Sequence, residues 1–301
     1  YSEKLIIGNN TREIINLVTN ENWNQNIYCQ ILTFLQHHNK KNFKLYKKLI
    51  NSNEDYYKNY RINFKTKILR NLVKIYNYSF SRWLKKNRVI LYKTYLGKID
   101  EFIINLKSKQ LPNYFPHYTS LSSIDEISRE KIKLNIKTDN LFEKFISSNL
   151  FLYMPKEFLE DFNDINQFIK KKNFPINPKK IFTTRTLSND NVFVRYMAEQ
   201  KEKYKTEVIL GQHGGAYGQF KFLWCEDHEI KISDKFLTWG WSKKNLKNVI
   251  PFGYLKSLKS KTQTVSKNLN KCSFFLRSRG KYPSRLDSST GSNQMSKYYS
   301  N

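Results

Sequence analysis

The sequence predicts an α/β protein in which a large helical region precedes a parallel sheet. Three observations support this prediction. Apolar residues recur at helical spacing through roughly the first third of the 301 residues. From residue 179 onward, short β-prone runs alternate with helical segments, as strands and crossover helices do. Eight of the ten glycines lie after position 210, so the backbone best able to turn tightly is concentrated in the last third.

The first segment, residues 11–109, is predicted to be largely helical because its apolar residues follow a helical repeat and Gly and Pro are nearly absent. The clearest example of the repeat is Phe64, Ile68, Leu72, Ile75, Tyr76, Phe80 and Leu84. A stripe with this spacing is typical of a packed helix, so we interpret its aromatic residues, including Trp83, as core and not as a ligand cage. His37 and His38 have no metal-ligating partners at useful spacing and are interpreted as structural or solvated.

Residues 111–120 (LPNYFPHYTS) contain two prolines and are expected to link this region to a second helical stretch at residues 141–172. Four strands are then predicted at 179–185, 206–211, 235–241 and 249–256. Between them we expect a helix at 189–204 capped by Asn189 or Asp190, a helix at 226–234, and a short helix or turn at 242–248.

The ends of these strands mark the candidate site. In parallel sheets, ligands bind at the carboxyl edge, on the loops that lead into the helices. Three loops therefore become candidates: Thr183–Ser188, Gln212–Gly218 and Trp239–Trp241. We expect them to converge on one site.

The second loop, QHGGAYG, carries the most specific signal. Its glycines, Gly214, Gly215 and Gly218, permit positive φ and let backbone N–H groups approach an anion beside His213. The spacing matches neither a Walker A loop nor the GxGxxG dinucleotide turn. The alternative interpretation is a tight turn around a hydrogen-bonded core histidine.

Downstream, Glu226 and Glu229 are spaced to share one helical face, with His228 beside them. Two carboxylates near a histidine-bearing loop can orient or activate the imidazole, or hold a sugar hydroxyl. The alternative is a solvated helix face. Together with Asp227 they fit no metal-ligand spacing, so no metal is expected.

Charge and cysteine content narrow the partner and the compartment. Lys and Arg number 53 against 25 Asp and Glu, a net charge of +28, but the lysines are spread along the chain without a compact basic motif. We therefore expect an anionic substrate or an anionic membrane surface as the partner, and no nucleic acid. Three cysteines without a CxxC pair, no long apolar run and no signal peptide predict a cytoplasmic protein, with peripheral contact at the inner face of the membrane as a further expectation.

The run QHGGAYGQFKFLWCEDHEIKISDKFLTWGW, followed by VIPFGYLK and RGKYPSRLDSSTGSNQM, resembles the LIC-type transferase family of O-antigen and surface-polysaccharide biosynthesis. The hallmark of that family is QHGG-x-YG, then E-x-x-E-x-x-x-SD, then TWGW. The resemblance covers roughly residues 140–300 well and the helical first third loosely. It implies a glycosyltransferase of GT-B-like architecture, in which two Rossmann-like domains face each other across a cleft.

On this basis we expect a helical N-terminal region at 1–115, a Rossmann-like α/β domain at 116–258, and the start of a second Rossmann-like domain at 259–301. Most of the second domain would then be missing. The sequence begins at Tyr1 without a methionine, and we expect it to be a piece of a longer protein.

The resemblance also implies a reaction, the transfer of a sugar-type unit from a nucleotide-activated donor to a glycan or lipid-linked acceptor of O-antigen or capsule. It would need no metal or other cofactor if cationic side chains and helix N-termini neutralise the leaving phosphate. His213 would be the base on the acceptor hydroxyl or a phosphate contact, Glu229 its orienter or the alternative base, and Glu226 the third catalytic candidate.

The implied substrate-binding residues are Arg185, Gln212, Gly214, Gly215, Tyr217, Gly218, Trp239, Arg277, Arg279 and Arg285. The C-terminal arginines suit bidentate contacts to phosphate, and the two aromatic residues suit stacking on a base or sugar. The alternative to this enzyme is a non-catalytic basic binding module, which would serve either nucleic acid or a scaffold derived from a degenerate transferase.

Overall fold

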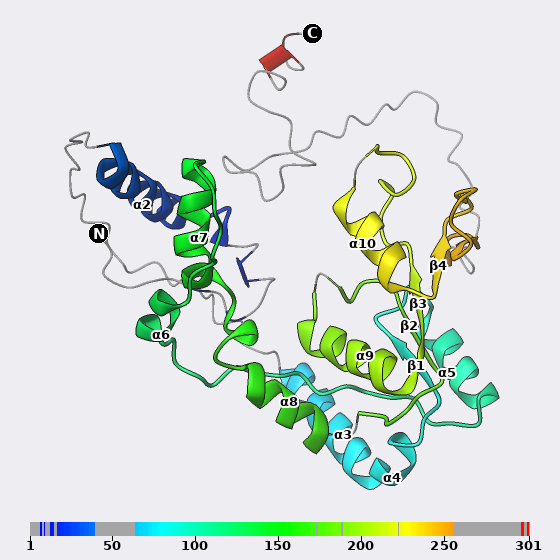
Figure 1. Ribbon diagram of the computed structural model, residues 1–301. Coiled ribbons are helices and arrows are strands. Elements are labelled where there is room, and N and C mark those ends of the chain that lie inside the picture. Colours follow the sequence, from blue (N-terminus) through cyan, green and yellow to red (C-terminus); the bar gives the residue numbers. More distant parts are fainter. Residues whose placement is uncertain are drawn as a thin grey trace. The chain divides into compact units, whose positions relative to one another are not determined.

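The computed structural model describes residues 7, 9, 13–14, 17–39, 64–172, 174–187, 189–221, 223–255, 296–297 and 300. The chain divides into two compact units, each assembled from separate stretches (Figure 1). The first consists of Tyr1–Tyr60, Ser120–Asn163 and Phe275–Asn301, and the second of Arg61–Thr119 and Asp164–Phe274. The two units are described separately.

The second unit contains a parallel five-stranded sheet. Its strands are β1 (Val89–Tyr92), β2 (Lys180–Thr183), β3 (Glu207–Gly211), β4 (Lys235–Thr238) and β5 (Val249–Pro251). They lie side by side in the order β1-β2-β3-β4-β5, and every neighbouring pair is parallel. Strand order therefore follows chain order among the described strands, without the reversal that marks a doubly wound sheet.

Four of the five strands confirm the predicted positions, and β1 corrects the prediction. This strand lies inside the segment predicted to be helical. Its sequence VILY is a four-residue apolar run with neither Gly nor Pro beside it, so no local signal marks it as a strand. Periodicity alone cannot separate so short a run from a turn of buried helix. Its pairing with β2 identifies it as a strand, since Val89 to Tyr92 lie opposite Lys180 to Thr183.

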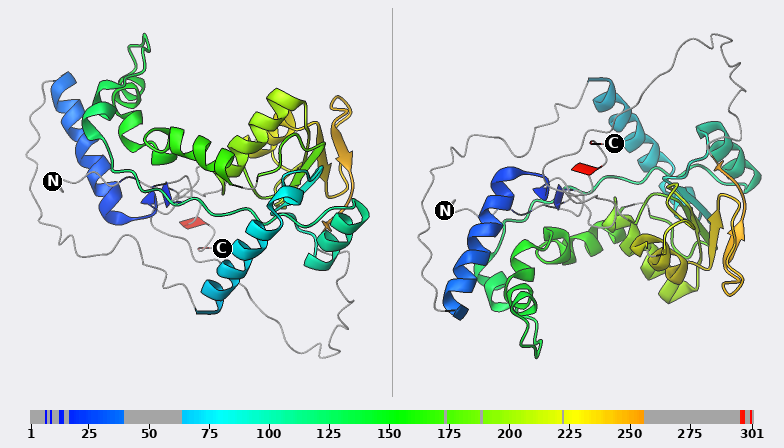
Figure 2. Two further views of the ribbon diagram at one scale, coloured as in Figure 1. Left: turned by 90° about the horizontal axis from the view of Figure 1, so that it is seen from below. Right: turned by 90° about the horizontal axis from the view of Figure 1, so that it is seen from above.

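Helices cover both faces of this sheet. Helix α9 (Asn191–Tyr204) and helix α5 (Lys98–Lys107) lie on opposite sides of the strands in all three views (Figures 1 and 2). Helix α10 (Trp224–Ile232) connects β3 to β4. The predicted cap of α9 is Asp190, whose carboxylate accepts a hydrogen bond from the Phe193 amide, and the helix ends at Lys205 in the left-handed conformation.

The core of the second unit lies between the strands, α9 and α8 (Phe162–Lys171). Each of the first four strands contributes buried apolar side chains, which are Ile90, Ile181, Val208, Leu210 and Phe236. Aromatic rings fill the space toward α9, where Tyr92 stacks on Phe193 at 4.1 Å between ring centroids. The 111–120 segment has no regular secondary structure, as expected, yet its Phe115 packs against Phe174 and Phe193. This link is therefore part of the core.

The prediction that the apolar stripe of residues 64–84 forms core is wrong for most of its members. The stripe lies on α3 (Phe64–Ser79) and α4 (Ser81–Leu84), and only Leu84 is fully buried. Phe64 is 74% exposed and Trp83 is 61% exposed. Helical periodicity identifies the residues that share a face, but it does not show whether another element covers that face.

The first unit is helical in its described residues. Its elements are α2 (Glu21–Asn39), α6 (Glu126–Lys131), α7 (Leu141–Tyr153) and the 3₁₀ turn η1 (Lys156–Phe158). Edge-to-face contacts of Trp23 with Tyr153 and of Phe34 with Phe145 join α2 to α7. The side chains of His37 and His38 lie outside the described part. No helix among the described residues has the length and apolar character needed to cross a bilayer.

Candidate active site

The candidate site lies at the carboxyl edge of the sheet, where four loops leave neighbouring strands. Thr183 at the end of β2 lies opposite Leu210, and Gly211 at the end of β3 lies opposite Leu237. The described parts of the three predicted loops are therefore neighbours, as expected, while Ser188 lies outside the described residues. The loop after β1 joins them, since the hydroxyl of Thr184 donates to the Lys93 carbonyl at 2.8 Å.

Gln212 holds the loops after β3 and β4 together. Its side-chain oxygen accepts hydrogen bonds from the Trp239 amide at 2.9 Å and from the Trp241 indole N–H at 2.8 Å. Its side-chain nitrogen donates to the Gly214 carbonyl at 2.7 Å, and the residue is buried. These bonds occupy both ends of the amide. Gln212 therefore positions the loops, in place of the substrate contact predicted from the sequence.

His213 is the partly exposed end of a buried chain of hydrogen bonds. Its Nδ1 lies 2.8 Å from the Tyr217 hydroxyl and its Nε2 lies 3.3 Å from the same oxygen. That hydroxyl donates to Oε2 of Glu229 at 2.8 Å. The His213 side chain is 22% exposed, whereas Glu229 is buried and its Oε1 lies 3.6 Å from Nδ1. The backbone carbonyl of His213 accepts a hydrogen bond from Tyr95 of the β1 loop at 2.9 Å. This chain confirms that His213 and Glu229 come together, and it adds Tyr217 between them.

Tyr217 is buried, which corrects the stacking role predicted for it. Its ring stacks on Phe236 of β4, with the centroids 5.8 Å apart, and meets the His213 ring edge-on. A ring enclosed in this way has no free face for a base or a sugar. Its polar end instead connects the imidazole to the carboxylate.

The chain of three side chains can move one proton along its length. A tyrosine hydroxyl carries a single proton, so when Tyr217 donates to the Glu229 carboxylate it accepts from Nδ1–H of His213. That arrangement leaves a lone pair on Nε2 of His213, and the imidazole can act as a base. With Glu229 protonated, both hydrogen bonds can reverse and Nε2 then carries the proton.

Burial tunes this carboxyl group. The pKa of Glu229 is raised to about 8, mainly by loss of solvation; the Tyr217 hydrogen bond opposes this shift and the negative charge of Glu226 adds to it. Burial and the charge of Glu229 also raise the pKa of Tyr217 well above its ordinary value, so the phenol keeps its proton. Glu229 therefore gains or loses its proton near neutral pH, as acid–base groups in enzymes often do.

Glu226 anchors the far end of the glycine loop. One carboxylate oxygen accepts the Gly218 amide at 2.7 Å, and the other pairs with Lys243 beyond β4. The Lys243 ammonium also lies over the Trp241 ring. Because Glu226 is buried and both of its oxygens are engaged, we assign it the role of positioning the loop.

The three glycines of the loop differ in how strictly the structure requires glycine at their positions. Gly218 has φ +74°, and an added Cβ would lie 2.9 Å from the Trp241 indole. Gly214 and Gly215 do not adopt the positive φ that glycine permits. An added Cβ would be in ordinary contact with Tyr217 at Gly214 and in open space at Gly215. The loop thus requires glycine for conformation at Gly218 and leaves open space beside Gly215.

The remaining predicted residues divide into two groups. Arg185 is exposed just beyond the end of β2, and Trp239 is half-buried beside Tyr254, so both lie at the carboxyl edge. Arg277, Arg279 and Arg285 lie outside the described residues. Among the described residues, no three or more His, Cys, Asp or Glu side chains gather in an arrangement that could hold a metal ion.

Lys93 and Tyr95, both on the loop after β1, were not predicted. The Lys93 ammonium pairs with Asp190, the cap of α9, at 2.8 Å, which puts a cation at the N-terminus of that helix. Recognising VILY as a strand would have found these residues, because the same strand-end rule applies to the segment that follows it.

Comparison with known proteins identifies the family. The model of the LIC12162 family transferase matches residues 2–301, which is nearly the whole chain. The chain belongs to the LIC12162 family of transferases. The match includes the first third of the chain, which the sequence motifs covered only loosely. No curated protein and no solved structure matches significantly.

In this transferase, Glu229→Gln should change how stability depends on pH. A folded-state pKa of about 8, against an ordinary 4.5, means that the folded protein binds this proton more tightly than the unfolded chain does. The stability contribution of the proton is complete below pH 4.5 and is lost as the pH rises through 8. Gln carries no such proton, so the melting temperature of the variant should rise relative to wild type across this range. Thermal unfolding of both proteins over the range measures the difference.

Glu207→Gln is the matched control for this measurement. Lys235 and Lys180 lower the pKa of Glu207, so its contribution is present above its ordinary pKa and is lost only in acid. At neutral and alkaline pH, the difference in melting temperature between Glu207→Gln and wild type should therefore stay constant as the pH changes. A difference between Glu229→Gln and wild type that does not change with pH would contradict the assignment of a raised pKa to Glu229.

Gly218→Ala should destabilise the transferase while Gly215→Ala should not. The first substitution places a Cβ at positive φ and against Trp241, at a cost of about 1–3 kcal/mol. The second places a Cβ in open space and should change the free energy of unfolding by less than about 0.5 kcal/mol. Urea unfolding measures both, and equal effects of the two substitutions would contradict this account of the loop.

Proposed function

We propose that this transferase is a glycosyltransferase. It would move a sugar-type unit from a nucleotide-activated donor to a hydroxyl of a glycan or lipid-linked acceptor in O-antigen or capsule synthesis. The observation that carries the proposal is the hydrogen-bonded chain of His213, Tyr217 and Glu229, of which only the imidazole is partly exposed. A partly exposed imidazole backed by a buried acceptor of protons is suited to deprotonating a hydroxyl group.

In the proposed reaction, Nε2 of His213 takes the proton of the acceptor hydroxyl as its oxygen bonds to the anomeric carbon of the donor. The bond from that carbon to the nucleotide phosphate breaks, and the phosphate oxygen keeps the electron pair. The imidazole passes its Nδ1 proton to Tyr217, which passes its own to Glu229. The proton is then held on a carboxyl group that burial keeps neutral up to a pH of about 8.

Cationic groups at the same edge support the departure of a nucleotide phosphate. Arg185 and Lys93 follow β2 and β1; Arg185 is exposed, and Lys93 lies at the N-terminus of α9, where it is paired with the capping carboxylate of Asp190. Helix N-termini and fixed cations stabilise charge that develops on phosphate. These groups are the reason that the proposed reaction needs no bound metal.

The GT-B-like architecture is part of the proposal. A second Rossmann-like domain beginning near residue 259 would face the carboxyl edge of the sheet and close the donor site. In that arrangement Arg277, Arg279 and Arg285 would contact the donor phosphates from the opposite side.

His213→Ala should lower turnover by about a hundredfold or more, because it removes the proposed base. Stability should change little, since the side chain is partly exposed and lies outside the hydrophobic core. The measurement is nucleotide release by the full-length protein from a panel of nucleotide sugars, with membranes supplying the acceptor. Absence of release from every donor by folded wild-type protein would favour the non-catalytic scaffold.

Tyr217→Phe tests the proton path. The substitution keeps the ring on Phe236 and removes the link between His213 and Glu229. Wild-type turnover should rise with pH as Glu229 loses its proton, because the deprotonated chain leaves a lone pair on Nε2. In Tyr217→Phe this rise near pH 8 should disappear, and turnover should fall by about tenfold or more. An unchanged pH profile would assign Tyr217 a packing role alone.

A further inference from the structure

Positive charge is concentrated in one part of the second unit. Between Phe64 and Arg88 the sequence contains eight Lys and Arg residues and no Asp or Glu. This segment forms α3, α4 and the turn before β1. It is an exception to the even spread of charge expected from the sequence.

Helix α3 presents an apolar face to solvent within the described part of the chain. Ile68, Leu72 and Ile75 follow one another at helical spacing and are exposed, Ile75 by 62%. The helix is attached to the 111–120 segment beside this face, where Tyr76 donates to the Pro112 carbonyl and Asn77 to the Tyr114 carbonyl. Tyr76 and Asn77 are half-buried, whereas Leu69, Arg70 and Lys74 are exposed together with the apolar residues.

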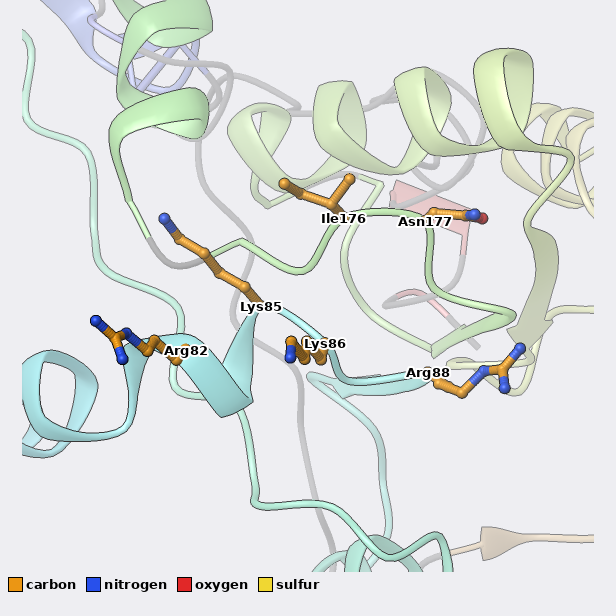
Figure 3. Close-up of a pocket in the computed structure, with 6 residues that line it drawn as sticks. All are labelled: Arg82, Lys85, Lys86, Arg88, Ile176 and Asn177. Atoms are coloured by element: carbon orange, nitrogen blue, oxygen red, sulfur yellow. The ribbon is translucent and has the colours of Figure 1, made fainter.

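A basic hollow adjoins this helix. Four cationic side chains from α4 and the following turn line it, together with a separate loop that contributes Ile176 and Asn177 (Figure 3). The four are Arg82, Lys85, Lys86 and Arg88. Trp83, which is largely exposed, lines a neighbouring hollow with Lys86 and with Leu106 of α5. Basic and apolar groups are thus interleaved on one surface.

Helix α5 extends the apolar part of this surface. Its residues Ile99, Phe102 and Leu106 are exposed and repeat every three or four positions. Leu106 places the end of α5 beside α4, because it lines the same hollow as Phe80 and Trp83. We call the combined region of α3, α4, the turn before β1 and α5 the basic-apolar surface.

We propose that the basic-apolar surface binds an anionic lipid bilayer. Exposed Ile, Leu and Phe side chains on amphipathic helices enter the acyl boundary of a membrane, and flanking Lys and Arg side chains reach the headgroups. Tryptophan prefers the membrane–water interface, at the level of the lipid headgroups. Clustered cations attract acidic lipids, and the segment from α3 to the turn before β1 has no acidic residue to oppose them.

The composition of this surface argues against two other partners, a second copy of the chain and nucleic acid. A symmetric contact between two copies would place the same cations of each copy close together, which is repulsive. Nucleic acid would match the charge but gains little from exposed aliphatic side chains. An anionic bilayer satisfies both components of the surface. The proposal rests on this surface alone and does not depend on the proposed glycosyl transfer.

Vesicle sedimentation of the full chain tests the proposal. Vesicles of phosphatidylglycerol and phosphatidylcholine should bind the protein, pure phosphatidylcholine vesicles should not, and added salt should weaken binding. Ile68→Ser with Leu72→Ser should lower the apparent affinity by about tenfold or more, and so should Arg82→Gln with Lys86→Gln. All four positions are exposed, so the variants should keep the wild-type melting temperature.

Matched controls lie elsewhere on the chain. Phe142→Ser removes an exposed apolar residue of the first unit, and Lys170→Gln with Lys171→Gln removes two exposed charges from α8. Both should bind vesicles as wild type does. Trp83 provides a direct reporter, because quenching of tryptophan fluorescence by brominated lipid should fall in Trp83→Phe.

Four results would overturn the proposal. Equal binding to neutral vesicles, or binding unaffected by the surface variants, would remove the role of this surface. Self-association that the same variants abolish, without vesicle binding, would make it an interface between copies. Salt-dependent binding of nucleic acid that only these variants lose, again without vesicle binding, would assign the surface to that partner. Nucleotide release with a soluble acceptor is a separate readout, so failure here and failure of the proposed transfer are distinguishable.

Discussion

The buried amide of Gln212 is the interaction on which the geometry of the site depends. It joins the backbone of the glycine loop to the backbone and indole of the loop after β4, and both ends of the amide are satisfied. Loss of either partner would leave a buried polar group unpaired, which costs about 1–3 kcal/mol. Glu226 fastens the other end of the same loop through Gly218 and Lys243. Held at both ends, the loop presents His213 in one orientation, which is the condition for pre-organised chemistry.

Packing in the core of the sheet also fixes the side chains that form the proton path. Tyr217 stacks on Phe236, which is fully buried in β4, so the packing of a strand fixes the hydroxyl that links His213 to Glu229. Glu229 itself is a cost to the fold, because burial favours its neutral form and ionisation above its pKa weakens the folded state. A stable core would be served better by an apolar residue at this position. The retention of a titratable carboxyl behind a partly exposed histidine is therefore explained more readily by chemistry than by stability.

The parts of this structure that sequence could predict are those encoded locally. Strands β2 to β5, the cap at Asp190 and the convergence of the strand-end loops follow from short-range patterns and from one rule about parallel sheets. The parts it could not predict depend on distant partners. Tyr95 and His213 are 118 positions apart, and Tyr217 could be assigned to the interior only once Phe236 was placed against it. The outward face of α3 is a third example, because a helical stripe reads the same whether or not a neighbour covers it.

The placement of the two proposed functions on one sheet has a geometric consequence. Arg88 and Asn177 of the basic hollow precede β1 and β2, whereas His213 follows β3, so the hollow and the site lie at opposite edges of the same strands. Four residues of strand separate these edges by about 13 Å. The basic-apolar surface nevertheless continues toward the site, because α5 begins at Lys98, shortly after Tyr95 of the site loop, while its Leu106 lines the hollow beside Trp83. A bilayer held against α5 as well as the hollow would therefore run along the strands from one edge of the sheet toward the other. The two proposals taken together thus favour an acceptor attached to the membrane over one that diffuses freely.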